Sequence, residues 1–254
     1  MIGADDQQIF TRTFTPVDTG ERTPILLFHD SLGCVALWRD FPNHLAQATG
    51  RTVIAYDRPG FGRSERRHDV LAPDFIAEEA RTVVPALCEA LEVSRFIACG
   101  HSVGGGMAVQ TAARWPECIE VLITIAAQAF VEDRTLSGIR EAKAAFAEPG
   151  ALGRLERHHG VRARWVLDAW TETWLAPEFS GWTLDEALAL VRAPTLAIHG
   201  SEDEFGSPRH PERIASGTGG QALLLPGTGH TPHRECPDLL VEKIAAFLTR
   251  LDAE

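Results

Sequence analysis

The stretch Gly100-His101-Ser102-Val103-Gly104 decides the fold of this chain. The pattern Gly-x-Ser-x-Gly is typical of a sharp turn that joins the end of a strand to the start of a helix and exposes a serine. Such a motif is meaningful only where a strand precedes it and a helix follows it. Residues 95–99 form a short apolar run of strand length, and residues 107–113 are good helix formers. The sequence therefore predicts that Ser102 lies at a strand-to-helix junction.

The glycines around this serine have a steric role. Gly100 and Gly104 carry no Cβ, which relieves crowding when the serine between them adopts a strained backbone conformation. Gly105 and Gly106 extend the run of small residues into the predicted helix, so the helix start can pack close to the sheet. Free N–H groups and partial positive charge at a helix N-terminus favour a developing negative charge nearby. We therefore expect Ser102 to act as a nucleophile.

A serine is a weak nucleophile at neutral pH, so a base and a group that orients the base are expected elsewhere. Residues 195–199 read as a buried strand, and the loop that follows them contains Asp203. Residues 222–225 read as a last strand, and the next loop contains His230. Open α/β sheets place their ligands at the carboxyl ends of the strands. Ser102, Asp203 and His230 are therefore predicted to meet in one site.

Other acidic residues compete for the role of the acid. Glu202 and Glu204 flank Asp203, and Asp57 follows a different predicted strand. Asp57 precedes an Arg-Pro-Gly turn, where a carboxylate most often binds backbone N–H groups. Asp203 is therefore the preferred acid.

Several further histidines receive structural interpretations. His233 lies three residues after the predicted base, a spacing that suits a metal pair, but no second pair of ligands stands nearby. We interpret it as a residue of the loop or of the pocket rim. His29 and His101 border the predicted site and are expected to be buried and hydrogen-bonded, although their roles stay open. The pair His158 and His159 lies among arginines and is predicted to form a solvated helix face.

Composition limits the classes of partner and the cellular location. The chain has 254 residues, of which 44% are hydrophobic, enough for one α/β domain with an insertion. The net charge of -11 argues against nucleic acid or an anionic membrane as a partner. The N-terminus shows no secretory signal, and no apolar run approaches membrane-spanning length. A cytoplasmic protein with reduced thiols is therefore predicted, since its cysteines are odd in number and irregularly spaced: Cys34, Cys88, Cys99, Cys118 and Cys236.

Apolar runs and helical patterns alternate along most of the chain, which predicts a doubly wound parallel sheet. The expected strands before the glycine motif are 25–28 and 52–56, and one follows it at 121–126. From 130 to 190 the pattern is helical, so we predict a helical cap inserted between two core segments, 1–129 and 191–254. The cap contains four of the six tryptophans, which suits an aromatic roof over an apolar substrate. These are Trp165, Trp170, Trp174 and Trp182.

The order of motifs resembles that of the α/β-hydrolase fold superfamily, which includes serine esterases, haloperoxidases and C–C hydrolases. Besides the serine motif, the resemblance rests on residues 27–33 and 56–64, on the Asp203 loop and on Gly229-His230. It implies an α/β-hydrolase fold, a mostly parallel sheet with a helical cap. It also implies that the backbone N–H groups of Ser31 and Val103 form an oxyanion hole. Asp30 stands where the superfamily usually has glycine.

The predicted chemistry is acyl transfer by a Ser-His-Asp triad through an acyl-enzyme, without a metal ion or an organic cofactor. The expected substrate is a small, largely apolar carboxylic ester, thioester or lactone. A first alternative is a C–C bond hydrolase or a cofactor-free perhydrolase or haloperoxidase; a C–C hydrolase would need a cation in the pocket, such as Arg162 or Arg164. A second alternative is a ligand receptor of slow turnover on the same fold. The oligomeric state stays open.

Overall fold

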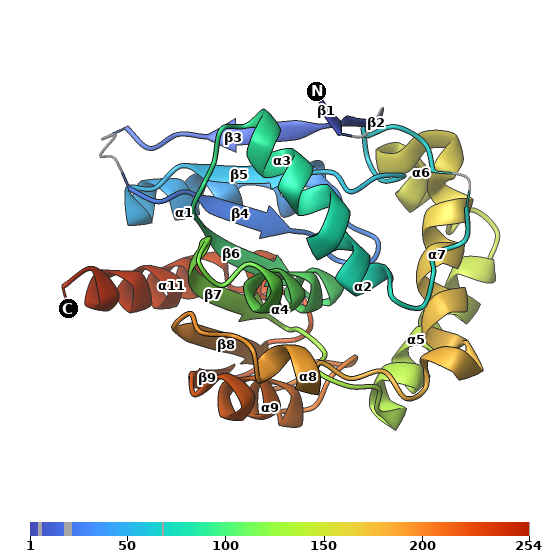
Figure 1. The fold of residues 1–254 in the computed structure, drawn as a ribbon. Coiled ribbons are helices and arrows are strands. Elements are labelled where there is room, and N and C mark those ends of the chain that lie inside the picture. The colour runs from blue at the N-terminus through green and yellow to red at the C-terminus, as the bar shows by residue number, and fades with distance from the viewer. Residues whose placement is uncertain (5–6, 18–21, 68, 254) are drawn as a thin grey trace.

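A seven-stranded sheet forms the centre of the computed structural model, which describes residues 1–4, 7–17, 22–67 and 69–253 (Figure 1). The strand order is β3-β5-β4-β6-β7-β8-β9, and every neighbouring pair is parallel except β3 with β5. The strands are β3 (Thr11–Phe14), β4 (Ile25–Phe28), β5 (Val53–Tyr56), β6 (Phe96–His101), β7 (Ile119–Ile125), β8 (Thr195–Gly200) and β9 (Gln221–Leu225). A separate antiparallel pair is formed by β1 (Ile2–Ala4) and β2 (Gln7–Ile9).

Helices cover both faces of this sheet. In Figure 1, α2, α3 and α4 lie on the near face, while α1 and α11 pack together on the other face. The α-helices are α1 (Phe41–Thr49), α2 (Phe75–Glu78), α3 (Val84–Ala90), α4 (Val103–Arg114), α5 (Asp133–Ala147), α6 (Gly153–His159), α7 (Ala163–Leu175), α8 (Asp185–Leu188), α9 (Arg209–Thr218), α10 (Pro232–Glu235) and α11 (Pro237–Asp252). Short 3-10 turns are η1 (Val35–Trp38), η3 (Gly160–Arg162) and η4 (Pro177–Phe179), and η2 (Glu79–Val83) is a π-helical turn.

The core forms two layers because neighbouring residues of a strand point to opposite faces. Along β4, Leu26 and Phe28 join the apolar cluster beneath α2, α3 and α4. Ile25 and Leu27 join the cluster beneath α1 and α11. All four side chains are buried, which explains why this strand reads as a continuous apolar run.

The predicted doubly wound sheet is confirmed, and the six strands expected from the sequence are its six parallel strands. The antiparallel edge strand β3 was missed. Its residues Thr11–Phe14 are mostly polar, and each is half-buried or exposed. The sequence therefore has no apolar run at this strand. The hairpin of β1 and β2 was not predicted either.

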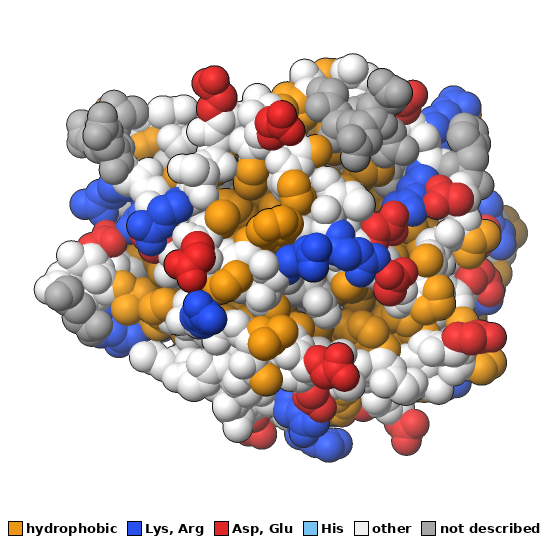
Figure 2. All heavy atoms as spheres, in the orientation of Figure 1, with side chains coloured by type: hydrophobic (Ala, Val, Ile, Leu, Met, Phe, Trp, Pro, Cys, Tyr) orange, Lys and Arg blue, Asp and Glu red, His pale blue; other side chains and the backbone are white. Residues whose placement is uncertain are grey.

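Helices α5 to α8 occupy the chain between β7 and β8, and a single bridge between Phe130 and Thr183 is the only strand-like pairing described there. Figure 1 shows α5, α6 and α7 stacked beyond one end of the sheet. On the face shown in Figure 2, acidic and basic side chains are interspersed, so the excess of acidic residues forms no single patch on this face. No helix among the described residues has the length and apolar character needed to cross a membrane. All five cysteines are free thiols.

Candidate active site

Ser102 lies on the turn between β6 and α4, as predicted. Its backbone has φ 55° and ψ -126°, a strained conformation for a residue with a side chain. A Cβ on Gly100 would lie 2.1 Å from the Gly104 carbonyl oxygen, and one on Gly104 would lie 2.2 Å from the Phe28 carbonyl oxygen. Neither position tolerates a side chain, so the two glycines of the motif allow the turn to pack against β4.

The structure brings Ser102, His230 and Asp203 into one hydrogen-bonded line. The Ser102 Oγ lies 3.0 Å from Nε2 of His230. On the other side of the ring, Nδ1 of His230 lies 2.8 Å from Oδ2 of Asp203. The three residues come from loops after β6, β8 and β9, far apart in sequence. This arrangement can transfer the serine proton to the imidazole while a carboxylate orients the ring.

Asp203 is held by more partners than the sequence indicated. Its Oδ1 accepts the backbone N–H groups of Phe205 at 2.7 Å and Gly206 at 3.1 Å. Its Oδ2 lies 3.1 Å from Nε2 of the buried His199, which is a second imidazole beside that of His230. Burial alone would raise the pKa of Asp203, but the hydrogen bonds from His199 and His230 outweigh it and hold the pKa well below its usual range. The lowered pKa favours the ionised form of Asp203 near neutral pH.

The pKa of His230 is raised relative to a free histidine. Burial of the ring lowers the pKa, but the hydrogen bond and the charge of Asp203 raise it by more. The charges of Glu204 and Asp30 act in the same direction. A base with a raised pKa binds a proton readily, which suits general base catalysis close to neutral pH.

Ser31 and Val103 lie where the resemblance implies. Ser31 lines the pocket beside Ser102, and Val103 is the first residue of α4. Within the described residues, neither backbone N–H has an acceptor. Both groups are therefore candidates for an oxyanion hole.

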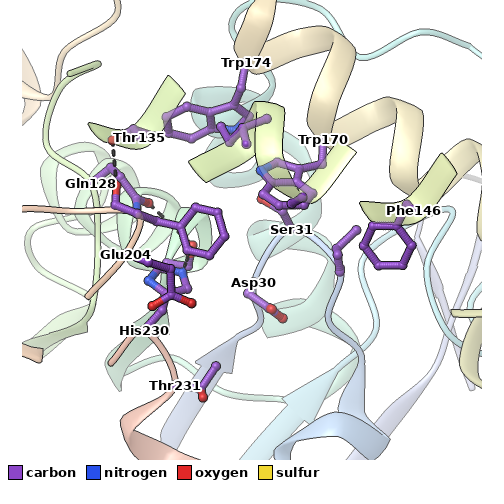
Figure 3. Close-up of a pocket in the computed structure, with 15 residues that line it drawn as sticks. Asp30, Ser31, Gln128, Thr135, Phe146, Trp170, Trp174, Glu204, His230 and Thr231 are labelled. Atoms are coloured by element: carbon purple, nitrogen blue, oxygen red, sulfur yellow. Dashed lines mark hydrogen bonds between the residues drawn. The ribbon is translucent and has the colours of Figure 1, made fainter. Parts of the chain in front are cut away.

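A pocket of about 230 Å³ contains the Ser102 hydroxyl and opens beneath α5 and α7 (Figure 3). Its walls combine apolar and aromatic side chains with polar ones, among them Ser102, Gln128 and His230. The lining residues are Asp30, Ser31, Leu32, Ser102, Gln128, Thr135, Ile139, Ala142, Phe146, Trp170, Trp174, Glu204, Phe205, His230 and Thr231.

Two of the four predicted roof tryptophans line this pocket, Trp170 and Trp174. Trp165 packs instead on Phe61, and Trp182 packs on Trp174. The aromatic roof prediction is thus correct for half of the residues proposed for it.

Sequence reasoning missed two polar residues of the site, His199 and Gln128. Gln128 follows β7 and is buried, and its Oε1 lies 3.4 Å from the Ser102 Oγ. His199 belongs to β8, one residue before its end. Both are polar residues at the carboxyl ends of buried strands, the same signal that pointed to Asp203.

The interpretation of His159 as a solvated residue is wrong. Its Nδ1 accepts the backbone N–H of Gly62 at 2.9 Å, and its Nε2 donates to the Leu32 carbonyl at 3.0 Å. The ring is buried and joins the end of α6 to two loops of the core. Leu32 follows Ser31, so this contact also supports the loop that carries the Ser31 N–H.

The interpretation of His233 as a rim residue is also wrong. It belongs to α10, is buried and packs against the Trp38 ring at 4.9 Å and the His101 ring at 4.7 Å. It does not line the pocket. His29 and His101 are buried and hydrogen-bonded as expected.

The alternative acid Asp57 and the arginines Arg162 and Arg164 lie outside the pocket. Asp57 accepts the backbone N–H groups of Val35 and Arg63, the structural role expected of it. Arg162 donates to the carbonyl oxygens of the 62–64 turn, and Arg164 is exposed and pairs with Asp168. No group of three or more potential metal-binding side chains occurs in the described part of the chain.

A family model described as alpha/beta hydrolase fold matches residues 23–161. The chain is 31% identical over 121 residues to a (lyso)-N-acylphosphatidylethanolamine lipase of Bos taurus, which covers 48% of this chain and 34% of the lipase. It is 28% identical over 209 residues to serine hydrolase BPHL of Mus musculus, which covers 78% of this chain and 69% of that protein. The chain thus spans about a third of the length of the lipase.

A solved structure with a similar fold is that of a membrane phospholipase A, a bacterial virulence factor. The TM-score is 0.78 at 20% sequence identity, and the match covers all of this chain and 86% of the phospholipase. At this identity the likeness concerns the fold.

Proposed function

Because this chain belongs to the alpha/beta hydrolase fold family, we propose that it is a serine hydrolase that cleaves small, largely apolar esters, thioesters or lactones. The observation that carries the proposal is the line of contacts from Asp203 through His230 to Ser102, which ends inside the pocket. That line of contacts supports the proposed reaction class, and the pocket walls support the proposed substrate size and polarity.

The proposed mechanism has two proton transfers at His230. The ring takes the proton of Ser102 as its Oγ attacks the substrate carbonyl carbon, and then protonates the leaving group. Asp203 keeps the proton of the ring on Nδ1 and stabilises the imidazolium that forms. Water then attacks the acyl-enzyme with His230 again as the base, which releases the acid and restores Ser102.

The oxyanion of each tetrahedral intermediate is proposed to accept the N–H groups of Ser31 and Val103. Loss of one such donor typically slows an acyl transfer about 10²–10³-fold. Both candidates are backbone groups, so their support comes from the loops that hold them. For Val103 it is the glycine turn at the start of α4, and for Ser31 it is the loop contacted by His159.

We propose that residues 130–190 form a cap over residues 1–129 and 191–254. The pocket takes its floor from the ends of β6 and β7 and its roof from α5 and α7, which supports this division. The ring of His159 and the Trp165 Nε1–H, which donates to the Asp69 carbonyl at 3.1 Å, connect the proposed cap to core loops.

The alternative of a C–C hydrolase acting on an acidic substrate has less support. No Lys or Arg side chain is among the described pocket residues, and neither Arg162 nor Arg164 reaches the pocket. A substrate carboxylate would find no cationic partner there.

The proposal is tested by intact-mass analysis after treatment with a fluorophosphonate probe. We expect stoichiometric labelling of the wild type and none of Ser102→Ala, followed by hydrolysis of short p-nitrophenyl esters by the wild type alone. Circular dichroism of both proteins controls for folding. A folded wild type that is neither labelled nor active on esters would refute the proposal and favour a ligand receptor.

A further inference from the structure

Two carboxylates face the pocket that contains Ser102. Asp30 lies in the loop after β4, and Glu204 lies in the loop after β8, next to Phe205. Figure 3 shows both in the lower half of the pocket, on the side of His230 and Thr231. Because no Lys or Arg is among the described lining residues, the charged side chains that line the pocket are acidic.

Neither carboxylate is paired directly with a neighbouring cation, although the charge of the buried Arg58 partly offsets that of Asp30. Within the described residues, the side chains of Asp30 and Glu204 make no hydrogen bond and no ion pair. The cation closest in contact to Asp30 is Arg58, which donates to the Asp30 backbone carbonyl at 2.9 Å, is itself buried and does not line the pocket. Arg134 donates to the Asp203 carbonyl at 3.0 Å and does not line it either. Glu204 is exposed and Asp30 is half-buried with its Oδ1 against Gly33, and we expect both carboxylates to remain accessible to a bound molecule.

Part of the pocket wall is aromatic, and it includes Phe205 beside Glu204. Trp170 and Phe205 meet edge to face at 5.8 Å, and Phe205 also packs on the His230 ring at 4.8 Å. Trp174 and Phe146 complete this wall. Aromatic faces attract cations such as quaternary ammonium groups, and indole is the strongest of the side-chain rings in this respect.

We propose that this pocket selects esters that carry a cationic ammonium group, bound between the carboxylates of Asp30 and Glu204 and the aromatic wall. The inference rests on the proposed hydrolase function and names its substrate class. An aromatic wall alone would accept any apolar group of the right size. The two free carboxylates distinguish a cation from a neutral group of the same shape, and they repel an anion.

The inference is tested first on the wild type with p-nitrophenyl esters of matched shape. The acyl groups are 4-(trimethylammonio)butanoyl, its neutral isostere 5,5-dimethylhexanoyl, and the anionic half-ester of glutarate. A second pair varies the alcohol: the choline and 3,3-dimethylbutyl esters of butyrate. We expect kcat/KM about tenfold higher for the cation than for its isostere in at least one pair, and lower still for the anion.

Charge-removing variants locate the origin of this preference. Asp30→Asn and Glu204→Gln should each lower the ratio of cationic to neutral kcat/KM several-fold, and the double variant should bring it close to one. Glu202→Gln is the matched control, because Glu202 belongs to the same loop and does not line the pocket. This control should keep the wild-type ratio. The preference should also shrink as ionic strength rises.

The outcomes separate the inference from the function it rests on. Equal or better hydrolysis of the neutral isosteres in both pairs, by a protein that the fluorophosphonate probe labels, would overturn the inference and leave the hydrolase intact. A cationic preference that survives in the double variant would also overturn it. Absence of labelling and of all ester hydrolysis would instead refute the hydrolase function itself.

Discussion

Replacing Asp203 by asparagine tests how the two imidazoles share one carboxylate. In the wild type, Oδ1 accepts two backbone N–H groups, and Oδ2 receives the ring N–H groups of His230 and His199. The single oxygen of asparagine is best placed toward the two backbone donors. Its NH₂ group then faces the rings of His230 and His199. Because the amide NH₂ and the two ring N–H groups are all donors, none of them finds an acceptor there.

The expected losses of activity and of stability follow from this clash between hydrogen-bond donors. His230 must turn its unprotonated nitrogen toward the amide, so its other nitrogen carries the proton and no longer accepts that of Ser102. We expect kcat to fall about 10³–10⁴-fold, as happens when a triad histidine is held in the wrong tautomer. The Nε2–H of His199 can instead donate to the Gly206 carbonyl oxygen, 3.2 Å away, and its Nδ1 has no hydrogen-bond partner in the described structure. The loss of charge-assisted bonds and one unsatisfied buried donor together cost about 2–4 kcal/mol of folding free energy.

The assay combines ester hydrolysis with thermal unfolding. For a chain of this length, that loss of stability corresponds to roughly 5–15 °C in Tm. Because the native pKa of Asp203 is depressed, its contribution is fully present above the unfolded pKa of about 3.9 and is lost as pH falls. The Tm difference between wild type and variant should therefore be largest near neutral pH and shrink in acid.

Asp57→Asn is the matched control, since Asp57 also accepts two backbone N–H groups and contacts no imidazole. It should lose stability and keep most of its kcat. An Asp203→Asn protein that retains more than a tenth of the wild-type kcat would refute the reasoning. So would an equally inactive Asp57→Asn protein.

Three further predictions concern histidines and the charge near one of them. His230→Ala should abolish ester hydrolysis, whereas His233→Ala should lower stability by about 2–3 kcal/mol through lost packing and leave kcat within tenfold; equal losses of kcat would contradict the assignment of the base. His159→Ala should lower kcat more than it raises KM, because the loop that carries the Ser31 N–H loses its support. His159→Gln should restore part of kcat. Unchanged kinetics in both variants would show that the contact is only structural. Glu204→Gln should move the acid limb of the kcat/KM profile to lower pH, because the Glu204 charge helps raise the pKa of His230. With a lower pKa, His230 stays neutral, and able to act as a base, in more acidic solution. A shift of the acid limb to higher pH would exclude this electrostatic effect.

The parts of the site that follow local rules could be predicted from sequence. The Ser102 turn could be predicted from Gly100 and Gly104, where any added Cβ would collide with a backbone carbonyl group. Asp203 and His230 stand in loops directly after apolar runs, and the carboxyl ends of parallel strands necessarily converge. These signals are local patterns combined with one rule of topology.

The parts of the site and fold that depend on tertiary contacts could not be predicted from the sequence. His159 reads as polar among arginines, and its burial depends on Gly62 and Leu32, which lie 97 and 127 residues away. His233 is covered by Trp38 from the other end of the chain. The edge strand β3 pairs with β5 alone within the described residues, and none of its side chains is fully buried, so hydropathy does not reveal it.

The contact between His101 and the loop of the base has a consequence for inactivation by heat. The Nε2–H of His101, the residue before Ser102, donates to the backbone carbonyl of His230 at 2.7 Å. The nucleophile and the base are therefore clamped to each other through rigid backbone, in addition to their own side-chain contact. Warming cannot separate these two groups by loosening one loop. Activity should therefore be lost at the same temperature as the fold and not before it.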